Sequence, residues 1–223
     1  MFADGFSKIL TCIAALALCA CGGENMHTTA ESATARTDTG PAVPGLEELL
    51  ASDFRSEADR GRDARRKPAE VLAFLGIQPG MNVMDVIAAG GWYTEVLALA
   101  VGPGGRVSAQ NPQFVLTFRD GAMDRALSAR LANNRLPNVS RLDREFADMT
   151  PADGVSDAAL TALNLHDVYN DSGEDAAVGM LRVVYSMLKP GGVFGVIDHE
   201  GDSDILQVAD DYGSQPPALM KSS

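Results

Sequence analysis

The chain has 223 residues, a net charge of −12 at pH 7 and 46% hydrophobic residues. These values suit one globular domain with an appendage. The acidic balance argues against a nucleic-acid partner, whose phosphates need clustered lysine and arginine side chains. The densest basic run, RGRDARRK at 60–67, is interrupted by Asp63 and preceded by Asp59, so we interpret it as the solvated face of a helix.

All three cysteines lie near the start of the chain: Cys12, Cys19 and Cys21. The run KILTCIAALALCAC is too short to span a bilayer and is typical of the apolar part of a secretory signal. Its end, LCAC, resembles the bacterial lipobox. That resemblance implies a signal peptide over 1–20, a lipid on Cys21, and a membrane-anchored protein facing the periplasm. The alternative is a disordered or buried apolar terminus.

The composition divides the remaining chain into three parts. Residues 21–45 are rich in threonine, alanine, serine and glycine, without an aliphatic core pattern, and we expect a flexible tether. Residues 46–200 carry the periodic patterns of a folded domain. Residues 201–223 are polar, contain two prolines and are expected to form an irregular tail with one short helix at most.

Helices and strands are expected to alternate along the domain. Ser56 caps a first helix, with Asp59 three residues later. Pro68 begins a second helix, which ends at Gly76. The later expected elements are strands at 81–87, 106–110, 138–145, 157–165 and 191–199, and helices at 92–101, 121–134 and 175–188. The alanine and leucine content of 157–165 leaves a helix as the alternative there.

This alternation predicts an α/β fold in which a parallel sheet is covered by helices on both faces, a Rossmann-like three-layer sandwich. Ligands in such sheets bind beyond the carboxyl ends of the strands. Polar or small residues follow the apolar runs at each of those ends: Asp85, 88–91, Gln110, Asn111, 164–167, Asp198 and His199.

The segment MDVIAAGGWYTEVLA at 84–98, which contains the first of these strand ends, predicts a buried strand, a turn of small residues and a helix. Small side chains let a backbone approach a ligand, and the first N–H groups of the helix point at it. The alternative is that this tight turn serves only the packing of the core and binds no ligand. Trp92 and Tyr93, which open the helix, would line a channel or pack in the core.

The stretch from about 65 to 199 resembles class I S-adenosylmethionine-dependent methyltransferases. The matching motifs are RKPAEVLAFLGIQPGMNVMDVIAAGGWYTEVL, GRVSAQNP, NLHDVYN and LKPGGVFGVIDH. Within the family the chain is similar to predicted bacterial enzymes of lipoprotein type. The resemblance implies the strand order 3-2-1-4-5, the cofactor S-adenosylmethionine and an unidentified methyl acceptor. It assigns LKPGG to a structural turn before strand five.

The family's glycine loop, acid-x-Gly-x-Gly-x-Gly, corresponds to Asp85, Ile87, Ala89 and Gly91, so two glycines are replaced. The acid that meets both ribose hydroxyls in the family aligns with Asn111. Asp148 matches the acid that meets the adenine amino group, or it is a helix cap. The resemblance therefore implies this cofactor-binding set: Asp85, Ala89, Gly90, Gly91, Asn111, Asp148 and Asn164.

The candidates for chemistry follow strands four and five. Family members place acceptor-binding groups where Asn164, His166 and Asp167 lie, and His166 could take a proton from a hydroxyl or amine. Asp198 and His199 would form a second acid–imidazole pair. We expect catalytic roles for His166, Asp167 and His199, or structural roles as loop and cap residues. The histidine spacing predicts no metal site.

The resemblance also implies a helix and an antiparallel strand pair after strand five, which need roughly 40 residues. The sequence after His199 is shorter and polar. We therefore expect a shortened sheet, an exposed edge at 193–197 and self-association through that edge.

Three functions stay open. The first is a methyltransferase, and the second is a non-catalytic, envelope-anchored binding protein with a degraded cofactor site. The third, a nicotinamide-dependent oxidoreductase, is disfavoured by Asn111 and by LKPGG. An exported protein faces away from the cytoplasm, where S-adenosylmethionine is made, and this favours the second.

Overall fold

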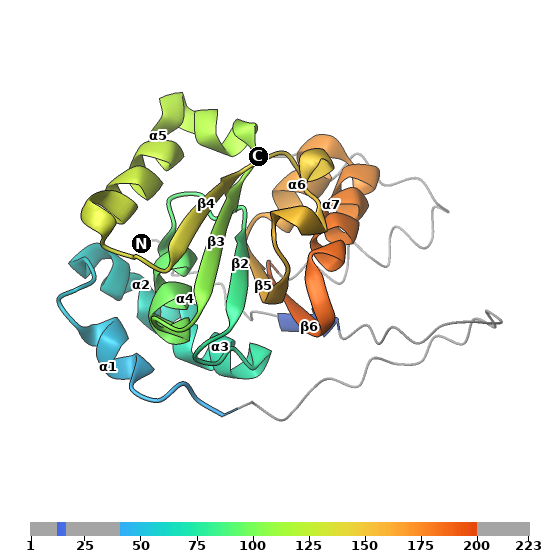
Figure 1. Ribbon diagram of the computed structural model, residues 1–223. Helices are drawn as coiled ribbons and strands as arrows, with labels where there is room; N and C mark the ends of the chain where they lie inside the picture. Colours follow the sequence, from blue (N-terminus) through green and yellow to red (C-terminus); the bar gives the residue numbers. More distant parts are fainter. Residues whose placement is uncertain (1–12, 17–40, 200–223) are drawn as a thin grey trace, which may run out of the picture.

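The computed structural model describes residues 13–16 and 41–199 (Figure 1). Their strands form one six-stranded sheet in the order β1-β6-β5-β2-β3-β4. All neighbouring strands pair in parallel except β1 and β6. The five parallel strands follow the predicted order 3-2-1-4-5, which is confirmed. The strands are β1 (Ile13–Leu16), β2 (Asn82–Val86), β3 (Arg106–Asn111), β4 (Val139–Asp143), β5 (Ser156–Ala162) and β6 (Leu188–Ile197).

The outer edge of β6 is paired, which corrects the expectation of an exposed edge at 193–197. β1 runs antiparallel to it, with Ile13 opposite Ile197 and Leu16 opposite Phe194. The pairing segment belongs to the run that we expected to be a signal peptide. The short helix expected within the tail lies outside the described residues.

Seven α-helices lie in the described part of the chain. Their local signals act as expected: Ser56 Oγ accepts the N–H of Asp59 at 3.1 Å, Pro68 opens α3, and Gly76 ends it in the left-handed conformation. None of the described helices is long and apolar enough to cross a membrane. The helices are α1 (Leu46–Ala51), α2 (Glu57–Arg66), α3 (Pro68–Leu75), α4 (Trp92–Val101), α5 (Gln113–Leu131), α6 (Leu165–Ser172) and α7 (Glu174–Ser186).

The sheet carries a hydrophobic core on each face. In β2, Val83 packs in one core with residues of α1, α3 and α4. Its neighbours Met84 and Val86 pack in the other with residues of α7 and the start of α5. Side chains on a strand point alternately to the two faces, so a nearly continuous apolar strand builds both layers. The three-layer prediction is confirmed (Figure 1).

Three boundaries differ from the sequence prediction. α5 begins at Gln113, not at 121, and its backbone leaves helical geometry at 118–121. β5 ends at Ala162, and the following residues start α6 instead of extending the strand. The LKPGG segment lies inside β6 as a bulge, since Leu188 pairs with Ser156 and Val193 with Ala158. Short 3₁₀ turns occur at Ala132–Asn134, Phe146–Asp148 and Pro151–Asp153.

Candidate functional site

A cavity of about 550 Å³ lies where β2 and β5 end. The loop after β2 and residues 162–164 at the end of β5 line it together with parts of α2, α4 and α5. This is the carboxyl edge of the sheet, where a ligand is expected in an open parallel α/β fold. Charged side chains of both signs line the cavity: Asp59, Asp85, Arg62, Arg66 and Arg130.

Three residues around this cavity have left-handed backbone conformations. The φ angles are 55° at Ile87, 50° at Ala89 and 60° at Leu163. A residue with a Cβ loses roughly 1–2 kcal/mol in this conformation. Ile87 and Ala89 occupy the two places where the resembled family has glycine. The loop therefore keeps the glycine-type backbone at an energetic cost, and the strain gathers at the cavity.

Two buried amides at the end of β3 hold this loop. Gln110 Oε1 accepts the N–H of Ile87 at 3.0 Å. Asn111 Oδ1 accepts the N–H of Ala89 at 2.8 Å, and its Nδ2 donates to the Ala89 carbonyl at 3.3 Å. Asn111 is fully buried. Its side chain thus fixes the loop backbone through both of its polar atoms, and the ribose contact that the resemblance implied stays a prediction.

Asn164 joins the end of β5 to the same loop. Its Nδ2 lies 3.2 Å from the Ile87 carbonyl, 2.9 Å from the Ala162 carbonyl and 3.3 Å from Thr161 Oγ1. The residue lines the cavity. The structure therefore places Asn164 where the sequence predicted a cofactor-binding residue, with its amide nitrogen shared among loop acceptors.

Asp85 is a buried carboxyl that lines the cavity from the end of β2. Burial raises the pKa of Asp85 to about 7, and hydrogen bonds from the side chain and backbone of Thr94 oppose the shift. Thr94 Oγ1 donates to Asp85 Oδ2 at 2.6 Å. Asp85 can therefore meet a cationic ligand as a carboxylate or hold a proton near neutral pH.

The two glycines of the loop face different surroundings. A Cβ on Gly91 would lie 2.7 Å from Leu127 Cδ1 and 3.2 Å from Arg130 Cδ, and its φ is +80°. Gly91 is thus required by the packing of α5. Gly90 lines the cavity, and its carbonyl accepts from Arg130 Nε at 3.0 Å. Of the predicted pair, Gly90 is the one placed to approach a ligand.

Most of the basic run at 60–67 is exposed, as interpreted from the sequence, but two of its arginines also contribute to the cavity. Arg62 and Arg66 line it, and the Arg66 guanidinium lies 4.7 Å from the centroid of the Trp92 ring. Burial lowers the pKa of Arg66. The signal in the sequence was the spacing of these arginines, since residues four apart share one side of a helix.

The aromatic residues at the start of α4 both pack and line the cavity. Trp92 and Tyr93 are buried, with their rings edge to face and centroids 4.6 Å apart. Burial raises the pKa of the Tyr93 phenol, so the phenol stays protonated at neutral pH. The two alternatives drawn from the sequence therefore describe one and the same arrangement.

Asp148, predicted to meet the adenine amino group, is exposed at the end of a 3₁₀ turn. It is absent from the residues that line this cavity. Its placement gives no support to the predicted contact.

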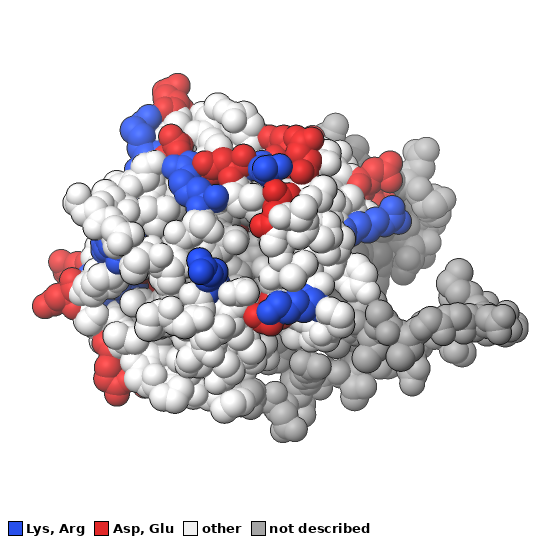
Figure 2. Space-filling model, viewed as in Figure 1, with Lys and Arg blue, Asp and Glu red and all other residues white. Residues whose placement is uncertain are grey.

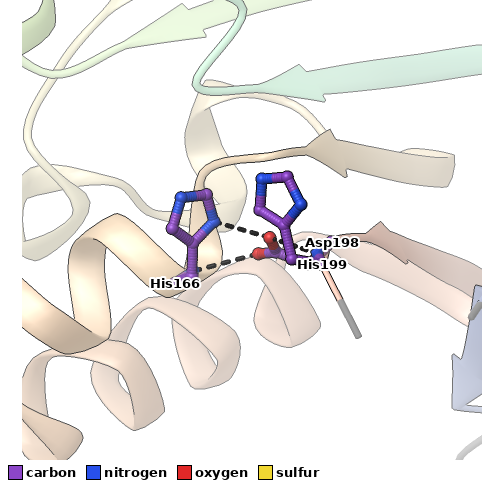
Figure 3. A group of neighbouring side chains, drawn as sticks. All are labelled: His166, Asp198 and His199. Atoms are coloured by element: carbon purple, nitrogen blue, oxygen red, sulfur yellow. Dashed lines mark hydrogen bonds and ion pairs between the residues drawn. The ribbon is translucent and has the colours of Figure 1, made fainter. Parts of the chain in front are cut away.

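The second group of predicted residues gathers beside the carboxyl ends of β5 and β6 (Figure 3). His166 Nδ1 lies 2.5 Å from Asp198 Oδ1, and the His166 peptide N–H donates to Asp198 Oδ2 at 3.0 Å. His199 lies against His166, with ring centroids 5.0 Å apart. The expected pairing of Asp198 with the His199 ring is wrong, because Asp198 meets the ring of His166.

A smaller cavity of about 270 Å³ reaches this group, with Asp198 and His199 in its lining. It shares Arg66, Tyr93 and Leu163 with the larger cavity. Asp167 is exposed, with Oδ1 at 3.1 Å from His166 Nε2, and lines a third cavity of about 390 Å³. The predicted catalytic residues are therefore neighbours of the larger cavity, not part of its lining.

Charged side chains of both signs are interspersed on the face of the molecule that Figure 2 shows, without a continuous basic surface. This agrees with the net charge of −12. It gives no support to a partner that binds through phosphates.

No protein-family model matches this chain, and a search of the curated proteins found no match. Solved structures do match. A SAM-dependent methyltransferase from Aquifex aeolicus superposes with a TM-score of 0.52 at 23% identity, over 80% of this chain and 79% of that one.

Two other matches are weaker. A protein-L-isoaspartate O-methyltransferase has a TM-score of 0.44 at 16% identity, over 58% of this chain and 35% of that one. A SAM-dependent O-methyltransferase from Thermotoga maritima has a TM-score of 0.45 at 15% identity, over 74% and 52%. The likeness to the Aquifex protein shows that this chain has its Rossmann-like fold.

Proposed function

We propose that the protein is a methyltransferase that uses S-adenosylmethionine and acts on an acceptor still to be identified. The observation that carries the proposal is the cavity of about 550 Å³ at the ends of β2 and β5, with acids and arginines in one lining. S-adenosylmethionine has an ammonium, a carboxylate and a sulfonium group, so it needs both signs of charge. The fold shared with the Aquifex methyltransferase supports this choice.

The lining suggests an orientation for the methionine end of the cofactor. Asp85 is a buried acceptor for the ammonium group. Arg66, partly withdrawn from water over Trp92, is a donor for the carboxylate. Asp59 is less free for such a role, because Arg130 donates to it at 3.0 Å.

Methyl transfer needs the acceptor atom, the methyl carbon and the sulfur in line. S-adenosylmethionine, when bound, would supply the methyl group and would leave as S-adenosylhomocysteine. The acceptor also loses a proton. The imidazole of His166, oriented by Asp198, is the candidate to take that proton.

The first experiment is calorimetric titration of the full chain with S-adenosylmethionine and, separately, with NAD. We expect saturable binding of S-adenosylmethionine alone. Arg66→Gln should weaken it by about tenfold, which corresponds to roughly 1.4 kcal/mol. Arg106→Gln is the matched control, because Arg106 is exposed at the start of β3, on the opposite edge of the sheet.

The alternatives predict different results. Binding of NAD in place of S-adenosylmethionine would replace the proposal with an oxidoreductase. Binding of S-adenosylmethionine without transfer of its labelled methyl group to any fraction of an envelope extract would support a binding protein. Equal loss of affinity in both arginine variants would move the carboxylate contact away from Arg66.

We further propose that Cys21 carries a lipid and anchors the protein to the periplasmic side of the envelope, as the LCAC sequence suggests. Cys21 lies outside the described residues. Cys21→Ser should leave an uncleaved precursor without lipid. The same gel mobility and detergent partitioning in variant and parent would refute the anchor.

A further inference from the structure

Two histidines and a carboxylate converge where α6 begins and β6 ends. His166 comes from α6, and Asp198 and His199 directly follow β6. Figure 3 shows both imidazole rings on the same side, with the Asp198 carboxylate between them. One ligand atom from each residue lies within 4.8 Å of the other two. The sequence concealed this group, because 32 positions separate His166 from Asp198.

His166 lies between two carboxylates. Its Nδ1 is 2.5 Å from Asp198 Oδ1, and its Nε2 is 3.1 Å from Asp167 Oδ1. A neutral imidazole has a single N–H, so it can donate to one of them only. A metal ion between Nδ1 and Asp198 would leave the Nε2–H for Asp167. Metal-binding histidines commonly have a carboxylate behind the ring in this way.

Backbone donors hold the Asp198 carboxylate in place. Oδ2 accepts the His166 peptide N–H at 3.0 Å, and Oδ1 accepts the His199 N–H at 2.8 Å. The Asp198 side chain is only 16% exposed. The central ligand is therefore preorganised, and its partners lie on the two segments that donate to it.

Small side-chain movements would complete a coordination geometry. Nitrogen and oxygen ligands lie about 2.0–2.2 Å from Zn²⁺, so neighbouring ligand atoms are roughly 3.4 Å apart. The contact between Nδ1 and Oδ1 must open by about 1 Å, and the exposed His199 ring can turn toward them. Two imidazoles and one carboxylate suit Zn²⁺ and related divalent transition metals, and they leave positions open.

We propose that His166, Asp198 and His199 bind one divalent transition-metal ion of the Zn²⁺ type. The open positions of the ion face the cavity of about 270 Å³ that Asp198 and His199 line. This cavity adjoins the proposed cofactor cavity at Arg66, Tyr93 and Leu163. The ion is thus placed to hold the nucleophilic atom of a methyl acceptor.

The role of the ion in catalysis rests on the proposed function, whereas its binding does not. A hydroxyl or thiol acceptor would coordinate through oxygen or sulfur and release its proton to solvent more easily. The coordinated atom then attacks the methyl carbon, and the electrons of the carbon–sulfur bond stay on the departing thioether. With the ion on Nδ1, His166 is a ligand and no longer the proton acceptor.

The test begins with the full chain, treated with a chelator and desalted. Titration with Zn²⁺ should give one bound ion per chain, and Co²⁺ should give the visible absorption of a site with nitrogen ligands. His199→Ala should weaken Zn²⁺ binding at least tenfold without loss of the fold, because His199 is exposed. Asp198→Asn should weaken it similarly. Asp171→Asn, on an exposed acid of α6, is the matched control.

Two results would overturn the proposal: no binding of Zn²⁺ or Co²⁺, or the same affinity in His199→Ala as in the Asp171→Asn control. Calorimetry with S-adenosylmethionine separates this proposal from the proposed function. Zn²⁺ binding without binding of S-adenosylmethionine would leave the metal site standing and refute the methyltransferase. Binding of S-adenosylmethionine without binding of Zn²⁺ would refute the metal site and leave the proposed function standing.

Discussion

Asn111→Asp distinguishes a residue that holds the loop from one that binds the cofactor. In the structure both polar atoms of the Asn111 side chain are used by Ala89. The substitution keeps the shape and the oxygen that accepts the Ala89 N–H. It replaces the Nδ2 donor with a second oxygen, which then faces the Ala89 carbonyl at about the present 3.3 Å.

The expected cost follows from these contacts. One hydrogen bond is lost, worth about 1 kcal/mol, and a charge is placed at a fully buried position. We expect the free energy of unfolding to fall by at least about 2 kcal/mol. For a domain of this size that lowers the melting temperature by about 4–8 °C.

The loss should depend on pH with a definite sign. Burial raises the pKa of the introduced carboxyl in the folded state above its unfolded value of about 3.9. When this carboxyl is protonated it can donate to the Ala89 carbonyl again, so the deficit is small below about pH 4. The deficit should grow as the pH rises through that value toward the folded-state pKa.

Thermal unfolding of parent and variant from pH 4 to pH 8, with calorimetry for S-adenosylmethionine, measures both properties. Asn134→Asp is the control, since Asn134 is exposed and gains the same charge. If Asn111 faced the ribose, the acid would bind its hydroxyls about twice as strongly as the amide does. A variant of unchanged stability with tighter cofactor binding would therefore refute the loop-holding role.

Three other substitutions test the remaining features. Asp85→Asn should flatten the pH dependence of the free energy of unfolding. Burial raises the pKa of Asp85 from 3.8 to about 7 in the folded state, so the parent protein loses stability as the pH rises from 3.8 to 7. The same dependence on pH in parent and variant, measured by chemical unfolding, would argue against this. Gly91→Ala should cost about 1–3 kcal/mol more than Gly76→Ala, since both have positive φ but only the Gly91 Cβ meets α5; equal losses in melting experiments would show that no clash exists. Removal of residues 1–20 takes away β1 and should promote self-association through the β6 edge, whereas a strictly monomeric shortened chain in light scattering would show that the edge needs no cover.

The sequence predicted the fold well because its signals were local and periodic. Ser56, Pro68 and Gly76 mark helix ends through their own backbone preferences, and these act at the same positions in the structure. The missed helix at the start of α5 has a different cause. Its turn is interrupted at 118–121, so no run long enough for a helical pattern was present.

The pairing of β1 with β6 was beyond sequence reasoning for a physical reason. An apolar run such as KILTCIAALALCAC is typical of a signal peptide and equally of a buried β-strand. Cleavage before Cys21 would remove β1, so the lipid anchor and the six-stranded sheet compete for the same residues. If the proposed cleavage before Cys21 occurs, it would therefore change the edge of the sheet at β6.

The sequence identified which residues lie near the cavities more readily than it identified their contacts. Position along the fold identified Asp85, Asn164 and His166, because polar residues after apolar strands meet at one edge. Their partners depend on side chains far apart in the sequence, as in the contact of His166 with Asp198. Spacing rules for metal ligands act within one element, so they passed over a group assembled from two.

The glycine loop shows how local and tertiary requirements interact. Ile87 and Ala89 have left-handed backbones that their side chains disfavour, and each must be held by something else. The two amides that follow, Gln110 and Asn111, supply hydrogen bonds to those two residues. The side chains at Ile87 and Ala89 and the two amides after them are therefore linked through these hydrogen bonds. The amide of Asn111 thus stabilises a loop conformation that glycine would adopt without help.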